Sequence, residues 1–246
     1  MGQYIINEFR KALKSRPSKI YIIAIAGACL LANVAVLAFR AIYGSNEGTF
    51  AYNILVYATW CFVIPYYSCI FIADIVYGEG RIQPGLSRTQ FYLSKLSASV
   101  LLAMAFLLIT VVTLFIVTLL FHLSDGTIGH TDIFDFLEKM VYAIPLWLAG
   151  IGFANMFLFG FSDRKKAYLF YFLLTVVLER GIMLLAAEPF RLEPFRLIRT
   201  VTVTQLFSLI PYPADPARNI PLTVSMGFFY LIVSSGIGIY RYNRRK

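Results

Sequence analysis

The sequence predicts an all-α membrane protein with six transmembrane helices and with both termini in the cytoplasm. Three observations support this prediction. The 246-residue chain is 59% hydrophobic and has a mean hydropathy of +0.72, which is too apolar for a soluble domain. It contains apolar stretches long enough to cross a hydrocarbon core of about 30 Å. Its basic residues also gather in alternate connections between those stretches.

Five apolar stretches carry no charged residue and are each long enough to span a bilayer. They cover residues 20–39, 52–73, 96–121, 141–161 and 220–240. The sixth stretch, residues 167–187, is interrupted by Glu179 and Arg180. We therefore expect a fifth span, in chain order, whose outer half is polar or broken.

The orientation follows from the positions of lysine and arginine. Of the 22 basic residues, 15 lie in segments 1–19, 77–95, 162–166 and 241–246, which six spans place on one side of the membrane. Short cytoplasmic connections carry such an excess of positive charge. The basic charge is thus explained by membrane topology, and the sequence offers no basic, aromatic soluble domain for nucleic acid.

The first segment, residues 1–19, predicts an amphipathic elbow helix on the inner leaflet. Its apolar residues share one side of a helix: Ile5, Phe9, Ala12 and Leu13. Its basic residues occupy the opposite side: Arg10, Lys11, Lys14 and Arg16. Both a plain membrane anchor and a docking surface for a partner fit this pattern.

The connection between the second and third spans, residues 77–95, is unusually polar and divides into two parts. Residues 77–85 contain three glycines and a proline around Glu79 and Arg81, which predicts a restricted hinge. Ser87 and Gln90 then form a capping box. Leu86 and Phe91 are spaced for a hydrophobic staple around the same helix start.

These signals predict that the third membrane helix begins at Arg88, well before its apolar part begins at Leu96. A helix from Arg88 to Phe121 would be about 51 Å long, against a hydrocarbon core of about 30 Å. Its first two turns should therefore stand outside the membrane. A helix start of this kind is suited to receiving force from a cytosolic partner.

Two groups of residues within the spans are candidates for a transport pathway or a dimer interface. The second span places Trp60, Tyr66 and Tyr67 around Pro65, which frees a backbone carbonyl. Glu179 and Arg180 lie at membrane depth, and neighbouring helical residues point about 100° apart, so each needs a partner on another helix or water. Ordinary helix packing and a snorkelling helix end remain the alternatives.

The segment before the last span, residues 188–218, is too apolar for a simple loop and too rich in charge and proline for a span. It opens with a tandem repeat, EPFRL-EPFRL, from Glu188 to Leu197. We expect residues 201–210 to re-enter the outer leaflet or to cap a cavity, where protein must cover the backbone. A duplicated surface loop is the alternative.

No enzymatic motif is present in the sequence. It lacks a Walker A pattern, HExxH and G-x-S-x-G, and its three cysteines all fall inside predicted spans without metal-ligand spacing. We expect no catalytic residue, no metal site and no cofactor bound by this chain.

The stretches FIADIVYGEGR and GLSRTQFYLSKL, taken with this layout, resemble the permease subunits of type-2 ABC exporters. The resemblance covers nearly the whole layout, and the residues that carry it are Tyr77, Gly80, Ile82, Gln83, Ser87, Arg88, Tyr92, Leu93, Ser94 and Lys95. One departure is a hinge shorter than that of the family, which leaves the existence of a separate coupling helix open.

The resemblance implies a half-transporter in a bacterial plasma membrane. It implies pairing with a second copy or a paralogue, and two cytosolic ATPases that bind ATP and Mg²⁺. The residues it assigns to ATPase coupling are Tyr77, Glu79, Arg81, Ser87, Arg88, Phe91 and Tyr92. The small size resembles exporters of amphipathic, antimicrobial or toxin peptides. A membrane scaffold or sensor that moves no cargo is the alternative.

Overall fold

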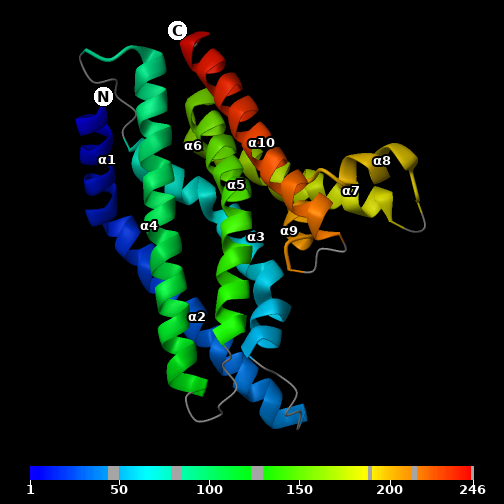
Figure 1. Ribbon diagram of the computed structural model, residues 1–246. Helices are drawn as coiled ribbons and strands as arrows, with labels where there is room; N and C mark the ends of the chain where they lie inside the picture. Colours follow the sequence, from blue (N-terminus) through cyan, green and yellow to red (C-terminus); the bar gives the residue numbers. More distant parts are fainter. Residues whose placement is uncertain (44–49, 79–84, 123–129, 188–189, 212–214, 245–246) are drawn as a thin grey trace.

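The computed structural model describes residues 1–43, 50–78, 85–122, 130–187, 190–211 and 215–244, and all regular structure in this part of the chain is helical (Figure 1). The predicted all-α class is confirmed. The elements are α1 (Gly2–Lys14), α2 (Arg16–Tyr43), α3 (Phe50–Tyr77), α4 (Arg88–His122), α5 (His130–Gly160), α6 (Arg164–Phe172), the π-helical η1 (Leu173–Leu178), α7 (Glu179–Ala186), α8 (Glu193–Arg199), α9 (Val203–Ser208) and α10 (Pro216–Arg244).

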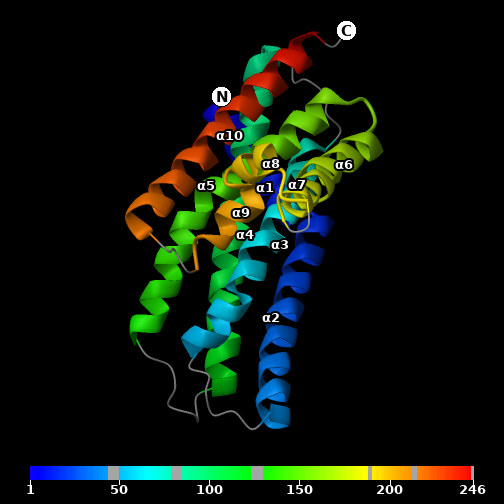
Figure 2. The ribbon, with the colours of Figure 1, turned by 90° about the vertical axis from the view of Figure 1, so that its right-hand side faces the viewer.

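Five helical segments of the described chain are long and apolar enough to span a membrane: Arg16–Ala35, Arg88–Leu120, Phe136–Gly160, Arg164–Ala186 and Pro216–Arg244. A shorter apolar helix, Phe62–Tyr77, forms the second half of α3. These lengths are those of a multi-pass membrane protein. Both termini lie at the same end of the molecule (Figures 1 and 2).

Helix α5 lies at the centre of the bundle and packs between α3 and α10. The contact with α10 is close because Gly227 of α10 lies directly on Pro145 of α5. A Cβ atom at Gly227 would lie 2.6 Å from the Pro145 backbone, so only glycine permits this approach.

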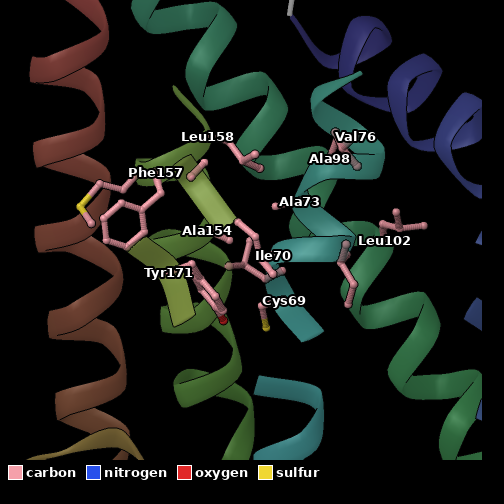
Figure 3. Close-up of a cluster of buried hydrophobic side chains, with 14 of the residues drawn as sticks. Cys69, Ile70, Ala73, Val76, Ala98, Leu102, Ala154, Phe157, Leu158 and Tyr171 are labelled. Atoms are coloured by element: carbon pink, nitrogen blue, oxygen red, sulfur yellow. The ribbon is translucent and has the colours of Figure 1, made fainter. Parts of the chain in front are cut away.

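The largest core cluster joins helices that are far apart in the sequence (Figure 3). Ala73 of α3, Ala98 and Leu102 of α4, Ala154 of α5 and Tyr171 of α6 are all buried in it. The three alanines at these crossings let the helices approach closely. Helix association within a membrane depends on such packing, because lipid provides no hydrophobic driving force between helices.

Helix α1 is amphipathic as predicted, but its apolar side faces protein instead of lipid. Ala12 is buried in the largest core cluster, and Ile5, Phe9 and Leu13 pack against that cluster. α1 lies alongside the first turns of α4 (Figure 1). The extended start of α4 supplies an apolar surface that covers this face, and the position of α1 at the inner leaflet stays a prediction.

The predicted start of the third membrane helix is confirmed. α4 begins at Arg88, and the Ser87 backbone N–H donates to Gln90 Oε1 at 3.0 Å while the Gln90 N–H donates to Ser87 Oγ at 3.2 Å. Leu86 packs against the cluster that contains buried Phe91, as a hydrophobic staple requires. Gly85, just before the cap, has a φ of +90°, a conformation that favours glycine.

The fifth apolar stretch is one helical run, α6–η1–α7, with a π-helical segment directly before Glu179. From the start of α6 to Glu179, its buried side chains recur every four residues: Ala167, Tyr171, Thr175 and Glu179. In a regular α-helix each four-residue step overshoots one turn by about 40°, so three steps would turn Glu179 about 120° from Ala167. The wider turns of η1 reduce this overshoot and keep Glu179 on the buried side.

The segment before α10 forms two short helices with different environments. α8, built from the second copy of the tandem repeat, has no buried residue and extends sideways with α7 (Figure 1). In α9, by contrast, Val203, Leu206 and Phe207 are buried in a cluster with residues of α3 and α5. The stretch predicted to re-enter or to cap is therefore covered by protein.

Candidate functional site

Two groups of polar contacts between helices involve residues that the sequence singled out. We call the first the terminal junction; it joins α1, α3, α4, α5, α6 and α10 around Lys95, Asp74 and Phe159, at the end where both termini lie. We call the second the Glu179 junction; it consists of Glu179, Tyr66 and Thr204 and joins α7, α3 and α9.

Lys95 is the first centre of the terminal junction. Its ammonium group lies 2.5 Å from the Glu8 carboxylate of α1 and donates to the Val76 carbonyl of α3 at 2.8 Å. The side chains of Lys95 and Glu8 are only 7% and 19% exposed, so the pair is partly removed from solvent. One side chain of α4 thus binds both α1 and the last turn of α3.

The Glu8 carboxylate also affects Tyr4, one helical turn away in α1. The Tyr4 ring packs on Phe91 of α4 at a centroid distance of 6.3 Å. Burial and the adjacent Glu8 charge raise the pKa of Tyr4 to about 12. The phenol therefore keeps its proton at physiological pH.

Asp74 and Arg164 form a second ionic contact, between α3 and the start of α6. The Arg164 guanidinium lies 3.5 Å from one Asp74 oxygen, and the Tyr168 hydroxyl donates to the other at 3.0 Å. Arg164 also donates to the Gly78 carbonyl and lies over the Tyr77 ring at 5.6 Å. This contact fixes the end of α3 just before residues 79–84.

A buried aromatic cluster completes the terminal junction. The Phe159 ring of α5 lies 4.9 Å from the rings of Tyr77, Tyr92 and Tyr242, measured between centroids. Gly238 of α10 leaves room for Tyr92, because a Cβ atom there would lie 2.3 Å from the Tyr92 hydroxyl oxygen. The first turns of α4 are therefore wedged between α5 and α10.

The residues proposed for ATPase coupling have different positions in the structure. Ser87 and Arg88 are exposed, and Tyr77 is half-buried. Phe91 and Tyr92 are fully buried in the aromatic cluster, so a partner approaching this end would meet Ser87 and Arg88 but not these two rings. Glu79 and Arg81 lie outside the described residues.

The residues predicted for the elbow helix also differ in their exposure. Phe9 packs against the core, whereas Arg10, Lys11 and Lys14 are exposed. These three basic side chains are free to contact lipid headgroups or a partner, while the apolar face is already used.

The Glu179 junction places a carboxyl group within the bundle. Glu179 is 7% exposed, and three donors point at it. The Tyr66 hydroxyl donates to Oε1 at 3.2 Å, while the Thr204 backbone N–H and hydroxyl donate to Oε2 at 2.9 Å and 2.5 Å. Three donors around one carboxyl group match its ionised form, which only accepts hydrogen bonds.

Glu179 also supplies the N-terminal cap that α9 lacks. The N-cap residue, Thr202, makes no side-chain cap hydrogen bond and instead donates to the Arg199 carbonyl at 2.9 Å. Because Thr204 lies in the first turn of α9, its N–H has no partner within the helix. The carboxylate from α7 satisfies this group and thereby ties α9 to α3 through Tyr66.

Tyr67 and Arg180, two of the other proposed pathway residues, lie beside this junction but do not bond to Glu179. Tyr67 is half-buried, and the exposed Arg180 lies close to its hydroxyl. The side chain of Trp60 is outside the described part of α3. Sequence reasoning missed Thr204 altogether, since a threonine in a TVTVT stretch carries no signal of a distant carboxylate.

Within the described residues, no group of three or more histidine, cysteine or acidic side chains is placed to hold a metal ion. The chain matches no protein-family model and no curated protein. The resemblance to type-2 ABC permeases therefore depends on the motif and the layout alone.

Proposed function

We propose that this chain is the membrane permease subunit of an ATP-driven exporter in a bacterial plasma membrane. It has six spans in this proposal, with α3 as the second, and the terminal junction faces the cytoplasm, where the basic residues gather. A second copy or a paralogue completes the transporter. ATP and Mg²⁺ bind to separate cytosolic ATPases.

The observation that carries this proposal is the start of α4. The helix is capped at Ser87, nine residues before its apolar part begins at Leu96, and its first turns bind α1 through Lys95 and α10 through Arg88. A flexible loop absorbs a displacement, whereas a capped helix end packed against its neighbours transmits it. A partner that presses on Ser87 and Arg88 would therefore move several helices together.

The Glu179 junction supports the same proposal from within the bundle. Polar groups inside membrane spans are expensive and commonly mark pathways. In this proposal α9 is a re-entrant segment of the outer half, and the buried carboxylate holds it against α3. Amphipathic peptides of the antimicrobial or toxin kind are the proposed cargo, since they suit a pathway with apolar walls and few polar groups.

The test is reconstitution of the chain with the ATPase encoded beside it, followed by measurement of ATP-dependent export of a labelled amphipathic peptide from proteoliposomes. Arg88→Glu should reduce ATP-driven export about tenfold or more, because it reverses the exposed charge on the coupling surface. Binding of the ATPase should weaken in parallel.

Asn243→Ala is the matched control. Arg88 donates to the Asn243 carbonyl at 3.2 Å, and the Asn243 side chain donates to Thr89 at 3.1 Å, so this variant weakens the same helix contact without changing charge. It should retain export. If no ATPase associates with the chain and no peptide moves with ATP, a scaffold or sensor role replaces the proposal.

A further inference from the structure

A cavity of about 300 Å³ lies among α2, α3, α4 and α5, apart from both junctions. Protein interiors seldom contain voids much larger than one water molecule, so a space of this size is more than a packing defect. It falls at the lower end of the range for ligand pockets. All four helices that line it are among the candidate membrane-spanning elements or the apolar part of α3.

The polar groups on the cavity wall are already paired within the protein. The Tyr21 hydroxyl lies 2.6 Å from Ser68 Oγ, and Thr110 Oγ1 donates to the Phe106 carbonyl at 2.7 Å. The Cys69 thiol donates to the Pro65 carbonyl at 3.3 Å, and the Trp147 indole donates to the Phe62 carbonyl at 2.7 Å. These groups have no donor left for a ligand.

This pairing excludes two kinds of occupant. An ordered water needs about two to four polar partners, and these side chains, whose hydrogens are already donated within the protein, offer it only acceptor lone pairs. A peptide or a polar solute would bury its own amide groups without hydrogen bonds, at a cost of about 1–3 kcal/mol for each group. A hydrocarbon chain has no such cost.

The cavity is also placed to receive such a chain from the membrane. Ile64 and Met104, which line it, are 58% and 38% exposed, so its wall continues onto the outer surface of the bundle. Ala28 of α2 lines it and is exposed as well. A chain entering beside these residues would pass from lipid into the cavity without crossing a polar region.

We infer that this cavity binds one acyl chain of a bilayer phospholipid. The chain lies against Pro65 and Cys69 of α3, one residue before and three residues after Tyr66, which bonds Glu179. Occupation therefore supports the segment of α3 that holds the Glu179 junction. This inference requires only the membrane-spanning helices and does not depend on the proposed transport function.

The test uses the full chain in nanodiscs that contain phosphatidylglycerol with a diazirine in one acyl chain. After photolysis, mass spectrometry should locate the label on the cavity residues, including Ile25 and Thr110. Ala28→Phe should reduce this labelling about fivefold or more, because the added phenyl ring, at an exposed position of α2, would fill the cavity. Ala26→Phe is the matched control, since Ala26 is equally exposed on α2 but does not line the cavity.

Thiol accessibility gives a second measurement that does not depend on a variant. Cys29 and Cys69 both line the cavity and are free, buried thiols. They should resist a water-soluble maleimide and react with a membrane-soluble one. Rapid modification of Cys29 or Cys69 by the water-soluble reagent, located by mass spectrometry to distinguish it from modification of Cys61, would overturn the inference by showing a hydrated cavity.

Two other results would also overturn it. Labelling spread over outward residues such as Leu108 and Ile116, unchanged by Ala28→Phe, would show general lipid contact without a site. Labelling that is present in nanodiscs with one copy and lost in those with two would show that a second copy of the chain covers the cavity.

Discussion

The terminal junction and the Glu179 junction are both polar contacts in an apolar bundle, but they differ in the number of independent contacts that hold the helices together. At the terminal junction, Lys95 and Asp74 anchor separate ionic contacts, and a buried aromatic cluster packs between them. At the Glu179 junction every hydrogen bond converges on one carboxyl group. Loss of one side chain should therefore leave part of the first junction intact but remove every hydrogen bond of the second, so that α9 is held by its apolar contacts alone.

This difference suggests that the two junctions have different roles in a protein that changes conformation. A region that transmits force benefits from several contacts that move together. A segment that must detach and return benefits from one contact of moderate strength, because such a contact can open without unfolding the bundle. The following predictions test this contrast, in order of decreasing effect.

The largest effect is expected for Glu179→Ala. It leaves the Thr204 N–H and hydroxyl and the Tyr66 hydroxyl without their acceptor, at a cost of about 3 kcal/mol. Amide exchange of residues 203–208 should accelerate by about a hundredfold in hydrogen-exchange mass spectrometry. Glu193→Ala in α8 is the control, because that carboxylate is exposed and pairs with Arg196 of the same helix; it should leave α9 unchanged.

Gly238→Ala should have the next largest effect, at the terminal junction. The added methyl group would overlap the Tyr92 hydroxyl, and overpacking of this kind costs about 2 kcal/mol. The midpoint of thermal unfolding in detergent should fall. Gly236→Ala, two residues away on α10 with open space at its Cβ, should not lower it. If the two variants lowered the unfolding midpoint equally, the close packing of Tyr92 against Gly238 would be contradicted.

Lys95→Met should cost about 1–2 kcal/mol, since the ion pair with Glu8 is partly buried and the apolar face of α1 keeps its own contacts. Exchange of α1 should rise moderately while the rest of α4 stays protected. Lys14→Met, at an exposed position of α1, should change little. Complete release of α1 would show that the terminal junction lacks the independent contacts described above.

Tyr66→Phe is expected to have the smallest effect, about 1 kcal/mol, because it removes one of the donors to Glu179 and leaves both Thr204 contacts. Exchange of α9 should rise about fivefold. An effect as large as that of Glu179→Ala would mean that Tyr66, and not Thr204, is the main anchor of the carboxylate.

The sequence predicted best those features that depend on residues close together in the chain. The start of α4 at Arg88 was predictable because the capping box and the staple are contained within six residues, Leu86 to Phe91. The apolar stretches likewise predicted the long helices. The candidate site was predictable only in part: Glu179 was singled out as a polar group that needs a partner, and Tyr66 only as a candidate for a pathway or a dimer interface.

What the sequence could not predict depends on contacts between distant elements. The bond from Glu179 to Thr204 joins residues 25 positions apart on separate short helices. The π-helical η1 precedes this bond, and no residue pattern marks it. The pattern of apolar residues on α1 is the same whether lipid or protein covers that face. The cover by protein depends on how far α4 extends beyond its apolar part.

The most direct test of the contrast between the two junctions is a pair of spin-label distances in nanodiscs, with the three native cysteines replaced by alanine. One pair, at Ser208 and Phe134, reports α9 against α5; the other, at Lys14 and Lys166, reports α1 against α6, and all four positions are exposed. In Glu179→Ala, the α9 distance distribution should broaden while the α1 distribution stays as narrow as in the unchanged protein. Broadening of both distributions, or of neither, would contradict a separately held α9.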